Sequence, residues 1–364
     1  MVENQTSAES SRTTIKCIEV KAPGGPEAMQ LVHIPRPTPG SKQALVRIAV
    51  SGVNFTDVAF RTGLIKSDLP VTLGLEGSGT VEAVGPDVSE VIPGDRVVYA
   101  MSRGSYAEYA VVPAAQLVKI PGSIDLSAAA AVMLQGMTAH YLTHSTYPVK
   151  RGETCLQPIS KPPFGWSNLL ILNGPKGVLK PVLVHAAAGG VGSMIVQIAK
   201  MLGARVLGTV STKEKAHAAR EFGVDEAILY TEGDFEAEVK RFTNGSGVDV
   251  VYDSVGKSTF EKSLNCLRIR GMLVLFGQTS GPIPPMDPAI LSGKGSLFLT
   301  RPSLTHYIRT REELLMRAGD VLNWVASSKV KPCIYRTYPL SEAAAALREL
   351  ENRRTVGKLL LRVP

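Results

Sequence analysis

The chain has few cysteines and no long hydrophobic run, and each shortage excludes a class of protein. Its four cysteines lie far apart in 364 residues, and no Cys-x-x-Cys pair occurs. Neither a zinc ribbon nor a disulfide framework is therefore expected. The longest apolar stretch, residues 126–134, is about half of the roughly 20 residues that a membrane helix requires. We expect a soluble protein in a reducing compartment.

Long runs of basic residues are also missing. The net charge is +8, which is compatible with an anionic ligand or with weak attraction to nucleic acid. No five consecutive residues are basic, and basic stretches such as residues 268–271 are short. We therefore do not expect nucleic-acid binding as the main role. Residues 1–14 lack the apolar core of a signal peptide, so we expect a flexible tail.

What the chain has is a large hydrophobic content, 44% against 20% charged residues, enough to bury at least one full core. From residue 182 onward, apolar β-branched runs alternate with helical patterns, of which residues 190–202 are the clearest. Continuous apolar strands joined by helices predict a parallel sheet covered on both faces. Six expected strands indicate a doubly wound, dinucleotide-type α/β fold: residues 182–186, 205–210, 226–230, 248–253, 272–276 and 296–300.

The N-terminal part has a different pattern. Residues 15–125 contain short alternating strands punctuated by Pro and Gly, which predict a compact, mostly antiparallel β-rich unit. Helical segments near 310–327 and 341–352 precede an apolar strand, KLLLRV, that we expect to pack on this first unit. The predicted domains are residues 15–137 with 301–364, and residues 138–300. We expect a cleft between them.

One segment, residues 155–181, does not fit either pattern. It is rich in Pro and Gly and is much longer than a connection of a few residues. We consider three explanations: a surface loop or subunit-contact element, a substrate lid, or an artefact such as a translated intron. Its removal is expected to leave the fold and the coenzyme site intact.

The strongest chemical signal is the sequence VLVHAAAGGVG, residues 182–192. Ala187, Gly189 and Gly192 have the spacing of the G-x-G-x-x-G dinucleotide fingerprint, directly after a predicted strand and at the start of a predicted helix. The glycines let the backbone approach a pyrophosphate, and the helix N-terminus offers unpaired N–H groups to its charge. The motif therefore predicts dinucleotide binding.

The end of the second predicted strand indicates which dinucleotide is bound. A site that prefers NAD has a carboxylate there to bind the ribose hydroxyls. This chain has Val210, followed by Ser211, Thr212 and Lys213, with Lys215 nearby. Hydroxyl and ammonium donors without an opposing acid favour a 2′-phosphate, so we predict NADPH as the cofactor. Tyr230, at the end of the third strand, is either a further phosphate contact or an ordinary half-buried strand end.

At this point the chain resembles the zinc-free medium-chain dehydrogenases and reductases, and within them the NADPH:quinone oxidoreductases related to zeta-crystallin. The resemblance runs from residue 15 to 364 apart from the unusual segment. It implies a β-rich GroES-like catalytic domain, a Rossmann domain and a cytoplasmic homodimer. The motifs that carry it are GVNFTD (52–57), GLEGSG (74–79), PGDRV (93–97), GSYAEY (104–109), HAAAGGVG (185–192), VYDSVG (251–256), LFGQTSG (275–281) and RPSL (301–304).

The resemblance also implies roles for individual residues. Asn54 and Thr138 would approach the nicotinamide end of the cofactor, and Asp57 would orient Asn54 or relay a proton, unless it is only a structural carboxylate of the turn. The remaining implied cofactor contacts fall into three groups. They are the pyrophosphate turn, Gly189, Gly190, Val191 and Gly192; the 2′-phosphate site, Ser211, Lys215 and Tyr230; and the residues that border the cofactor, Phe276, Gly277, Arg353, Gly357 and Lys358.

The resemblance bears on metal chemistry as well. Zinc-dependent relatives have Cys where this chain has Asn54 and His where it has Leu75, so no catalytic zinc is expected. Without that Lewis acid an alcohol substrate is disfavoured. His140 and His144 lie four residues apart in a predicted helix without a third ligand, so we interpret them as ordinary helix residues.

The implied activity is NADPH-dependent reduction of a quinone, with the protein orienting the nicotinamide and the substrate. Two tyrosines that often line the quinone site of close relatives are replaced here by Ala59 and Ile65, which predicts a wider, more aliphatic pocket. Reduction of an enone or 2-alkenal double bond is the alternative within the same class. RNA binding, known for some relatives of zeta-crystallin, and a non-catalytic NADPH-binding role are alternatives of other classes.

Overall fold

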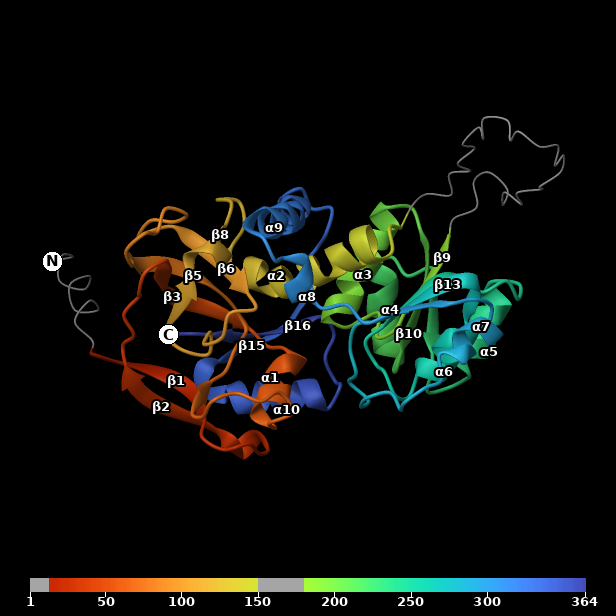
Figure 1. Ribbon diagram of the computed structural model, residues 1–364, viewed down its shortest axis with the longest axis horizontal. Helices are drawn as coiled ribbons and strands as arrows, with labels where there is room; N and C mark the ends of the chain where they lie inside the picture. Colours follow the sequence, from red (N-terminus) through yellow and green to blue (C-terminus); the bar gives the residue numbers. More distant parts are fainter. Residues whose placement is uncertain (1–12, 150–179) are drawn as a thin grey trace. The chain divides into compact units, whose positions relative to one another are not determined.

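The structure is a computed structural model in which residues 13–149 and 180–364 are described. They form two compact units (Figure 1). The first comprises the described residues of Met1–Tyr141, with Ala188–Ile195 and Ser303–Pro364; the second comprises those of Leu142–Ala187, with Val196–Pro302. The predicted domain boundaries stay a prediction. The segment predicted at 155–181 falls almost entirely outside the described residues, as does the predicted tail apart from Thr13 and Thr14.

The first unit is built on β-sheets, as the alternating pattern predicts. A seven-stranded sheet has the order β15-β16-β3-β5-β6-β8, with β7 paired to β3, and a three-stranded sheet has the order β2-β1-β4. All of these pairs are antiparallel except β15 with β16. The strands are β1 (Thr14–Val20), β2 (Met29–Pro35), β3 (Gln43–Gly52), β4 (Val71–Thr72), β5 (Glu76–Val84), β6 (Arg96–Ala100), β7 (Tyr109–Pro113), β8 (Val118–Lys119), β15 (Ile334–Pro339) and β16 (Lys358–Arg362).

The core of this unit follows from alternation along β3. Ala44, Val46 and Ile48 are buried on one face of the strand, and they pack with Val81 of β5 in one hydrophobic cluster. Residues 358–362 of the apolar C-terminal run KLLLRV form β16, which pairs with β3. The chain thus returns to its first domain and inserts a late strand beside an early one.

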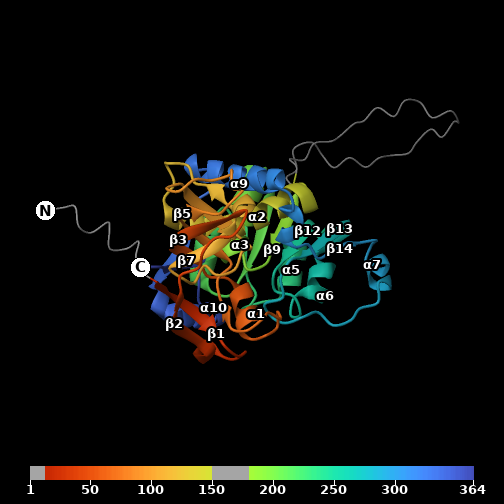
Figure 2. The same cartoon turned by 60° about the vertical axis from the view of Figure 1, so that its left-hand side comes forward.

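Helices cover the sheets of the first unit. Helix α2 (Leu126–Tyr141) packs against β3, β5, β6 and β16, and α9 (Arg311–Ala326) packs on α2. Helix α1 (Phe55–Arg61) lies beside α10 (Ala343–Glu351), as Figures 1 and 2 both show. The short helix α8 (Leu304–Tyr307) brings Tyr307 into a stack with Tyr141, with ring centroids 4.2 Å apart. Helix α9 begins at a capping box in which Thr310 and Glu313 satisfy each other's backbone N–H groups.

The second unit contains a six-stranded, fully parallel sheet in the order β11-β10-β9-β12-β13-β14. Counted along the chain this is the order 3-2-1-4-5-6 of a doubly wound dinucleotide fold, so the predicted fold class is confirmed. The strands are β9 (Pro181–Val184), β10 (Arg205–Val210), β11 (Glu226–Leu229), β12 (Val248–Asp253), β13 (Leu267–Leu275) and β14 (Phe298–Thr300). The helices that follow them are α3 (Gly190–Met201), α4 (Lys213–Glu221), α5 (Phe235–Phe242), α6 (Phe260–Asn265) and α7 (Ala289–Gly293).

One helix ends earlier than predicted. Helix α2 stops at Tyr141, and Leu142–Thr146 forms a π-helical turn. The Tyr147 N–H bonds to the carbonyl of Leu142, five residues back, at 3.1 Å. His140 and His144 therefore do not share one α-helical face. In residues 13–149 and 180–364, no helix is both long and apolar enough to cross a bilayer.

Candidate functional site

Four polar side chains meet in the interior of the first unit, and we call them the buried ion cluster: Asn54, Glu76, Gln135 and Lys358. They are 5%, 0%, 6% and 3% exposed. Asn54 is the N-cap of α1, Glu76 begins β5, Gln135 lies in α2 and Lys358 begins β16. Helix packing and strand pairing thus bring together residues that are far apart in the sequence.

The cluster is organised around one ammonium group. Lys358 Nζ donates to Glu76 Oε2 at 2.6 Å and to Asn54 Oδ1 at 2.8 Å. Burial lowers the pKa of the Lys358 amino group, whereas the negative charge of Glu76 acts in the opposite direction. The second oxygen of Glu76 accepts the N–H of Leu134 in α2 at 2.6 Å. The two buried charges are therefore paired and hydrogen-bonded, as charges in an interior require.

Asn54 connects this ion pair to Gln135. Its Oδ1 accepts from both Lys358 and Gln135 Nε2, the latter at 2.8 Å. Its Nδ2 donates to the carbonyl of Gly52 at 3.2 Å and to Glu76 Oε2 at 3.3 Å. The amide is thus saturated within the protein. The predicted approach of Asn54 to the nicotinamide stays a prediction. In the structure its side chain is hydrogen-bonded to Lys358, Gln135, Glu76 and the carbonyl of Gly52.

Asp57 lies next to the cluster and is completely buried. Its Oδ2 accepts the backbone N–H of Asn54 and the hydroxyl of Tyr106, at 2.8 and 2.9 Å, and forms the capping box of α1. Burial raises the pKa of this carboxyl to about 7 despite those hydrogen bonds. Its Oδ1 has no hydrogen-bond partner in the described chain. The cap gives Asp57 a structural role, and its predicted part in catalysis stays a prediction.

The glycine-rich turn is the next part of the site. It joins β9 to α3, and Gly190 to Gly192 form the first turn of that helix. Gly189 forms a parallel bridge with Gly357, whose N–H donates to the carbonyl of Ala188 at 2.8 Å. A Cβ added to Gly190 would lie 3.2 Å from Cγ of Gln135. The C-terminal segment and Gln135 therefore line the turn that the sequence predicts to hold the pyrophosphate.

Thr138 and Arg353 were also predicted to contact the cofactor. Thr138 is buried in α2, one helical turn after Gln135. Arg353 is exposed and has a left-handed φ of 56° just after α10. Lys358 was also predicted to contact the cofactor, and its ammonium group lies within the buried ion cluster.

In the second unit, the predicted 2′-phosphate residues follow the ends of two adjacent strands. Strand β10 ends at Val210, and Thr212 caps α4 by accepting the backbone N–H of Lys215 at 3.2 Å. Ser211 and Lys215 are half-buried, and Tyr230, which follows β11, is 45% exposed. No acidic residue stands at the end of β10, so this edge suits an anionic group.

Phe276 and Gly277 follow β13 and turn against the end of β12. The Phe276 N–H donates to the carbonyl of Asp253 at 2.9 Å. A Cβ on Gly277 would lie 2.5 Å from the carbonyl oxygen of Ser254, so only glycine fits there. Arg301 donates to the carbonyl of Gly277 at 3.0 Å and fixes this turn.

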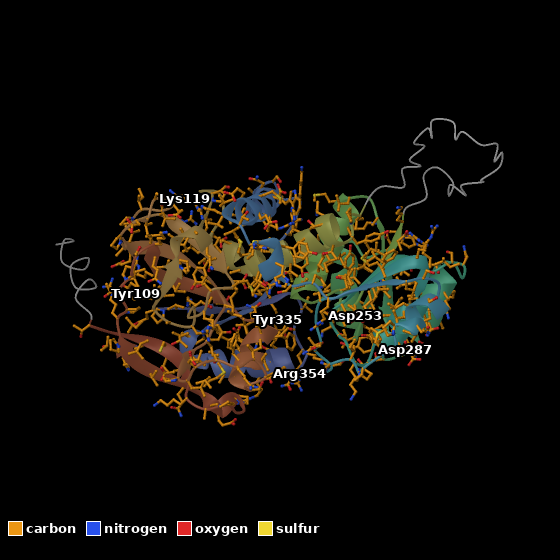
Figure 3. The ribbon with its side chains drawn as sticks, in the orientation of Figure 1. Tyr109, Lys119, Asp253, Asp287, Tyr335 and Arg354 are labelled. Atoms are coloured by element: carbon orange, nitrogen blue, oxygen red, sulfur yellow. The ribbon has the colours of Figure 1, made fainter. Side chains whose placement is uncertain are left out.

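A buried polar chain lies beneath the carboxyl ends of these strands. His185, directly after β9, contacts Thr209 Oγ1 at 2.9 Å through Nδ1 and Ser263 Oγ at 3.0 Å through Nε2. The Ser263 hydroxyl donates to Asp253 Oδ2 at 3.0 Å, and Asp253 lies at the end of β12 (Figure 3). Burial lowers the pKa of His185. The neutral ring therefore donates from Nε2 and accepts the Thr209 hydroxyl at Nδ1.

Sequence reasoning did not identify Glu76, Gln135, Tyr106 or this buried polar chain. Glu76 is the one that carried a signal in the sequence, because it is the single acid of the motif GLEGSG (74–79). Gln135 and Tyr106 have no such signal, since their importance depends on distant partners.

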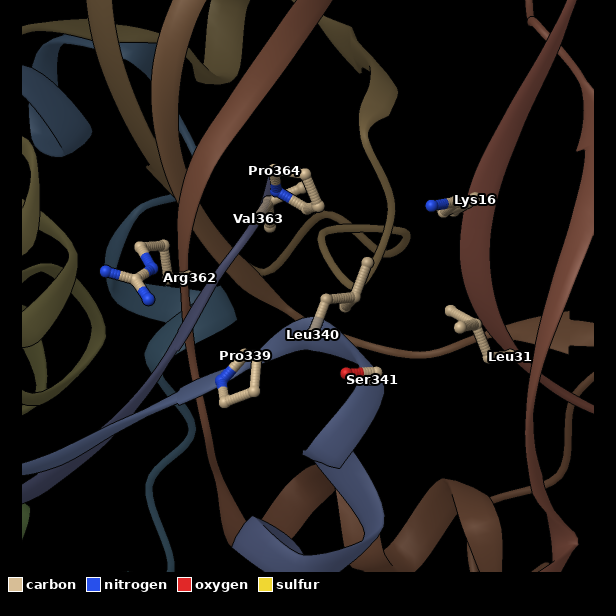
Figure 4. A pocket seen from close by; sticks show the side chains of 8 residues that line it. All are labelled: Lys16, Leu31, Pro339, Leu340, Ser341, Arg362, Val363 and Pro364. Atoms are coloured by element: carbon tan, nitrogen blue, oxygen red, sulfur yellow. The ribbon is translucent and has the colours of Figure 1, made fainter.

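A surface pocket of about 330 Å³ lies elsewhere on the first unit (Figure 4). None of the predicted site residues lines it. Its lining residues are Lys16, Leu31, Pro339, Leu340, Ser341, Arg362, Val363 and Pro364. Within the described ranges, no group of three or more His, Cys, Asp or Glu side chains is arranged to hold a metal ion.

Comparison with known proteins identifies the family. Residues 40–122 match the alcohol dehydrogenase GroES-like domain, and residues 190–321 match the zinc-binding dehydrogenase family. Quinone oxidoreductase of Pseudomonas aeruginosa is 41% identical, with 95% of this chain and 99% of that protein covered. A 2-haloacrylate reductase of a Burkholderia species is 38% identical, with coverage of 93% and 96%.

Solved structures agree with this result. The crystal structure of Escherichia coli quinone oxidoreductase complexed with NADPH matches with a TM-score of 0.86 at 38% identity, over 95% of this chain and 99% of that one. The resemblance predicted from the motifs is confirmed. The chain belongs to the quinone oxidoreductase family of the medium-chain dehydrogenase/reductase superfamily.

Proposed function

We propose that the protein is an NADPH-dependent quinone oxidoreductase. The observation that carries the proposal is the edge at β10, where a site for NADH would have a carboxylate and this chain has Val210, Ser211 and Lys215. The bound coenzyme supplies a hydride. The chain's own residues bind the phosphates, orient the nicotinamide half and hold the substrate near it.

The glycine-rich turn and the buried ion cluster fit such a coenzyme. Gly189 and Gly190 leave the backbone accessible at the N-terminus of α3, where N–H groups and the helix dipole favour phosphate. Gln135, which lies against Gly190, has a buried carbonyl oxygen without a partner in the described chain. The N–H groups of the helix N-terminus can donate to a phosphate of the coenzyme. The Gln135 oxygen can accept a hydrogen bond from an uncharged N–H or O–H group of the same molecule.

We infer that the reaction needs no zinc. Asn54 and Leu75 stand where zinc-dependent relatives have ligands, and the site already holds a cation, because Lys358 Nζ lies 2.6 Å from Glu76 Oε2. A second cation beside this ammonium would be repelled. Quinones accept a hydride without a metal, since the charge that develops on oxygen is delocalised in the ring.

The segment from α1 to residue 69 suits an apolar acceptor. Phe55, Leu64, Ile65 and Leu69 expose large apolar side chains there, and Leu64 is 70% exposed. Ala59 and Ile65 offer aliphatic rather than aromatic contacts, so substrate selection would depend on size and apolar area more than on ring stacking.

Steady-state rates test the proposal. With NADPH we expect turnover of 1,4-benzoquinone and 9,10-phenanthrenequinone, and slower turnover with NADH. The similarity to a 2-haloacrylate reductase favours a second candidate, reduction of an activated carbon–carbon double bond. A panel of 2-alkenals and 2-haloacrylates measured beside the quinones separates the two. Turnover of the alkenes alone would replace the first proposal by the second.

We further propose a homodimer located in the cytoplasm. Light scattering after size exclusion should give twice the monomer mass, and a monomer mass would reject the dimer. Cell fractionation with a cytosolic marker tests the location.

A further inference from the structure

Gln135 has a carbonyl oxygen that the protein leaves without a partner. The side chain is 6% exposed, and its Nε2 donates to Asn54 Oδ1 at 2.8 Å. Its Oε1 is buried, and the described chain provides no donor to it. A buried acceptor that lacks a partner loses its hydrogen bonds to water without replacement, which is unfavourable. Such an atom is expected at a place where a ligand supplies the missing donor.

The orientation of the Gln135 amide follows from Lys358. An ammonium group can only donate, so the Asn54 atom that it contacts at 2.8 Å must be the carbonyl oxygen. The same Asn54 oxygen faces the Gln135 amide, which must therefore present its nitrogen. The charge of Lys358 thus fixes the orientation of the Asn54 amide, and the Asn54 amide fixes that of Gln135. The carbonyl oxygen of Gln135 is then the atom left without a donor.

The side chain that carries this acceptor lies beside the glycine-rich turn. A Cβ on Gly190 would be 3.2 Å from Gln135 Cγ and 3.7 Å from its Nε2. Phosphate oxygens accept hydrogen bonds at neutral pH and cannot satisfy an acceptor. The 2′-phosphate half is predicted at Ser211 and Lys215. The donors that remain on the coenzyme belong to its nicotinamide riboside half: the carboxamide N–H₂ and the ribose hydroxyls.

We propose that Gln135 Oε1 accepts a hydrogen bond from a neutral donor of the nicotinamide riboside half of NADPH, with Lys358 and Glu76 as positioning residues that set the polarity of the Gln135 amide. This inference rests on the proposed function. It assigns to Gln135 a coenzyme contact, and to the ion pair a role in binding geometry as well as in packing.

The test uses Gln135→Met, which keeps the length of the side chain and removes the acceptor. Gln116→Met is the matched control, because Gln116 also has a buried carbonyl oxygen without a partner in the described chain, in a turn (Ala114–Gln116) that contains no predicted site residue. Dissociation constants are measured by calorimetry for three ligands: NADPH, its 3-acetylpyridine analogue, in which a methyl ketone replaces the carboxamide, and 2′,5′-ADP, which lacks the nicotinamide half.

We expect Gln135→Met to weaken NADPH binding about 3- to 10-fold, as the loss of a neutral hydrogen bond predicts, and to leave 2′,5′-ADP binding within about 2-fold of the unmodified protein. Gln116→Met should change neither. If the carboxamide is the donor, the unmodified protein prefers NADPH to the acetylpyridine analogue and the variant loses that preference. If a ribose hydroxyl is the donor, the variant binds both coenzymes more weakly by the same factor.

Unchanged NADPH affinity in a folded Gln135→Met variant would overturn the inference. An equal loss of 2′,5′-ADP affinity would also overturn it, because it would show general damage to the site. Failure of the unmodified protein to bind NADPH at all is a different result, and it would reject the proposed function itself.

Discussion

Lys358 and Glu76 are separated by 282 positions in the sequence, yet their side chains form a fully buried ion pair at 2.6 Å. Each is also hydrogen-bonded to a neutral group, Lys358 to Asn54 and Glu76 to the N–H of Leu134. Such a pair contributes little net stability when it is compared with apolar residues of the same shape, but removal of one partner leaves a buried charge.

We therefore expect Lys358→Met to lower the free energy of unfolding by about 3–5 kcal/mol, since Glu76 would remain charged and unpaired. The double variant Glu76→Gln with Lys358→Met should recover more than half of that loss. Urea unfolding measures both. A double variant as unstable as the single one would show that the cost arises from packing rather than from charge.

The raised pKa of Asp57 predicts a dependence of stability on pH. Its carboxyl has a pKa of about 7 in the folded protein and close to 4 when unfolded. Between these values the unfolded chain has released the proton and the folded chain retains it, so the contribution of Asp57 to stability falls as pH rises, by at most about 1.4 kcal/mol per unit. Above pH 7 the contribution levels off.

Asp57→Asn should remove this dependence. The stability of the variant relative to the unmodified protein is expected to increase from pH 4 to pH 7 and then stay constant, as followed by urea unfolding across that range. Asp68→Asn is the control, because Asp68 is exposed. A stability difference that does not vary with pH would contradict the raised pKa.

Lys215 is expected to discriminate between the two coenzymes. Lys215→Ala should raise the KM for NADPH at least 10-fold and that for NADH less than 2-fold, because only NADPH carries the 2′-phosphate. Lys240→Ala is a suitable control, since Lys240 pairs with Glu236 on the surface of α5. Equal effects of Lys215→Ala on both coenzymes would place the phosphate elsewhere.

The buried hydrogen-bonded chain through His185, Ser263 and Asp253 predicts a loss of stability when one of its members is removed. Ser263→Ala would leave the Nε2–H of His185 and one side of Asp253 without their partner, and we expect a loss of about 1–3 kcal/mol in the free energy of unfolding. Ser292→Ala, at an exposed residue of α7, should cost less than about 0.5 kcal/mol. Equal losses in the two variants would argue against a special role for the chain through His185.

Much of the fold was predictable because short sequence patterns determine its strands and helices. Apolar runs such as residues 205–210 and 248–253 became central parallel strands, and the glycine spacing marked the start of α3. Strand β15 had no such pattern, because most of its side chains are exposed and its pairing with β16 is specified by the partner strand. The end of α2 was missed because the π-helical turn at residues 142–146, LTHST, contains no Pro or Gly that would mark the end of a helix.

The site was only partly predictable for the same reason. Asn54, the glycine-rich turn and Lys215 belong to compact motifs that can be identified along the chain. Gln135 and Glu76 act through partners 81 and 282 positions away. The missing hydrogen-bond donor at Gln135 can be recognised only in the folded structure. The spacing of residues along the sequence does not show which buried oxygen lacks a donor.

The position of β16 has a consequence for biosynthesis. This strand lies between β15 and β3 in the sheet, and it carries the only ammonium that contacts Glu76 in the described chain. A ribosome makes Glu76 long before Lys358, so the nascent first domain has a carboxylate whose counter-charge has not yet been synthesised. The nascent domain should therefore remain open to chaperones and proteases until residue 358 has left the ribosome, and chains released before it is made should be cleared rapidly.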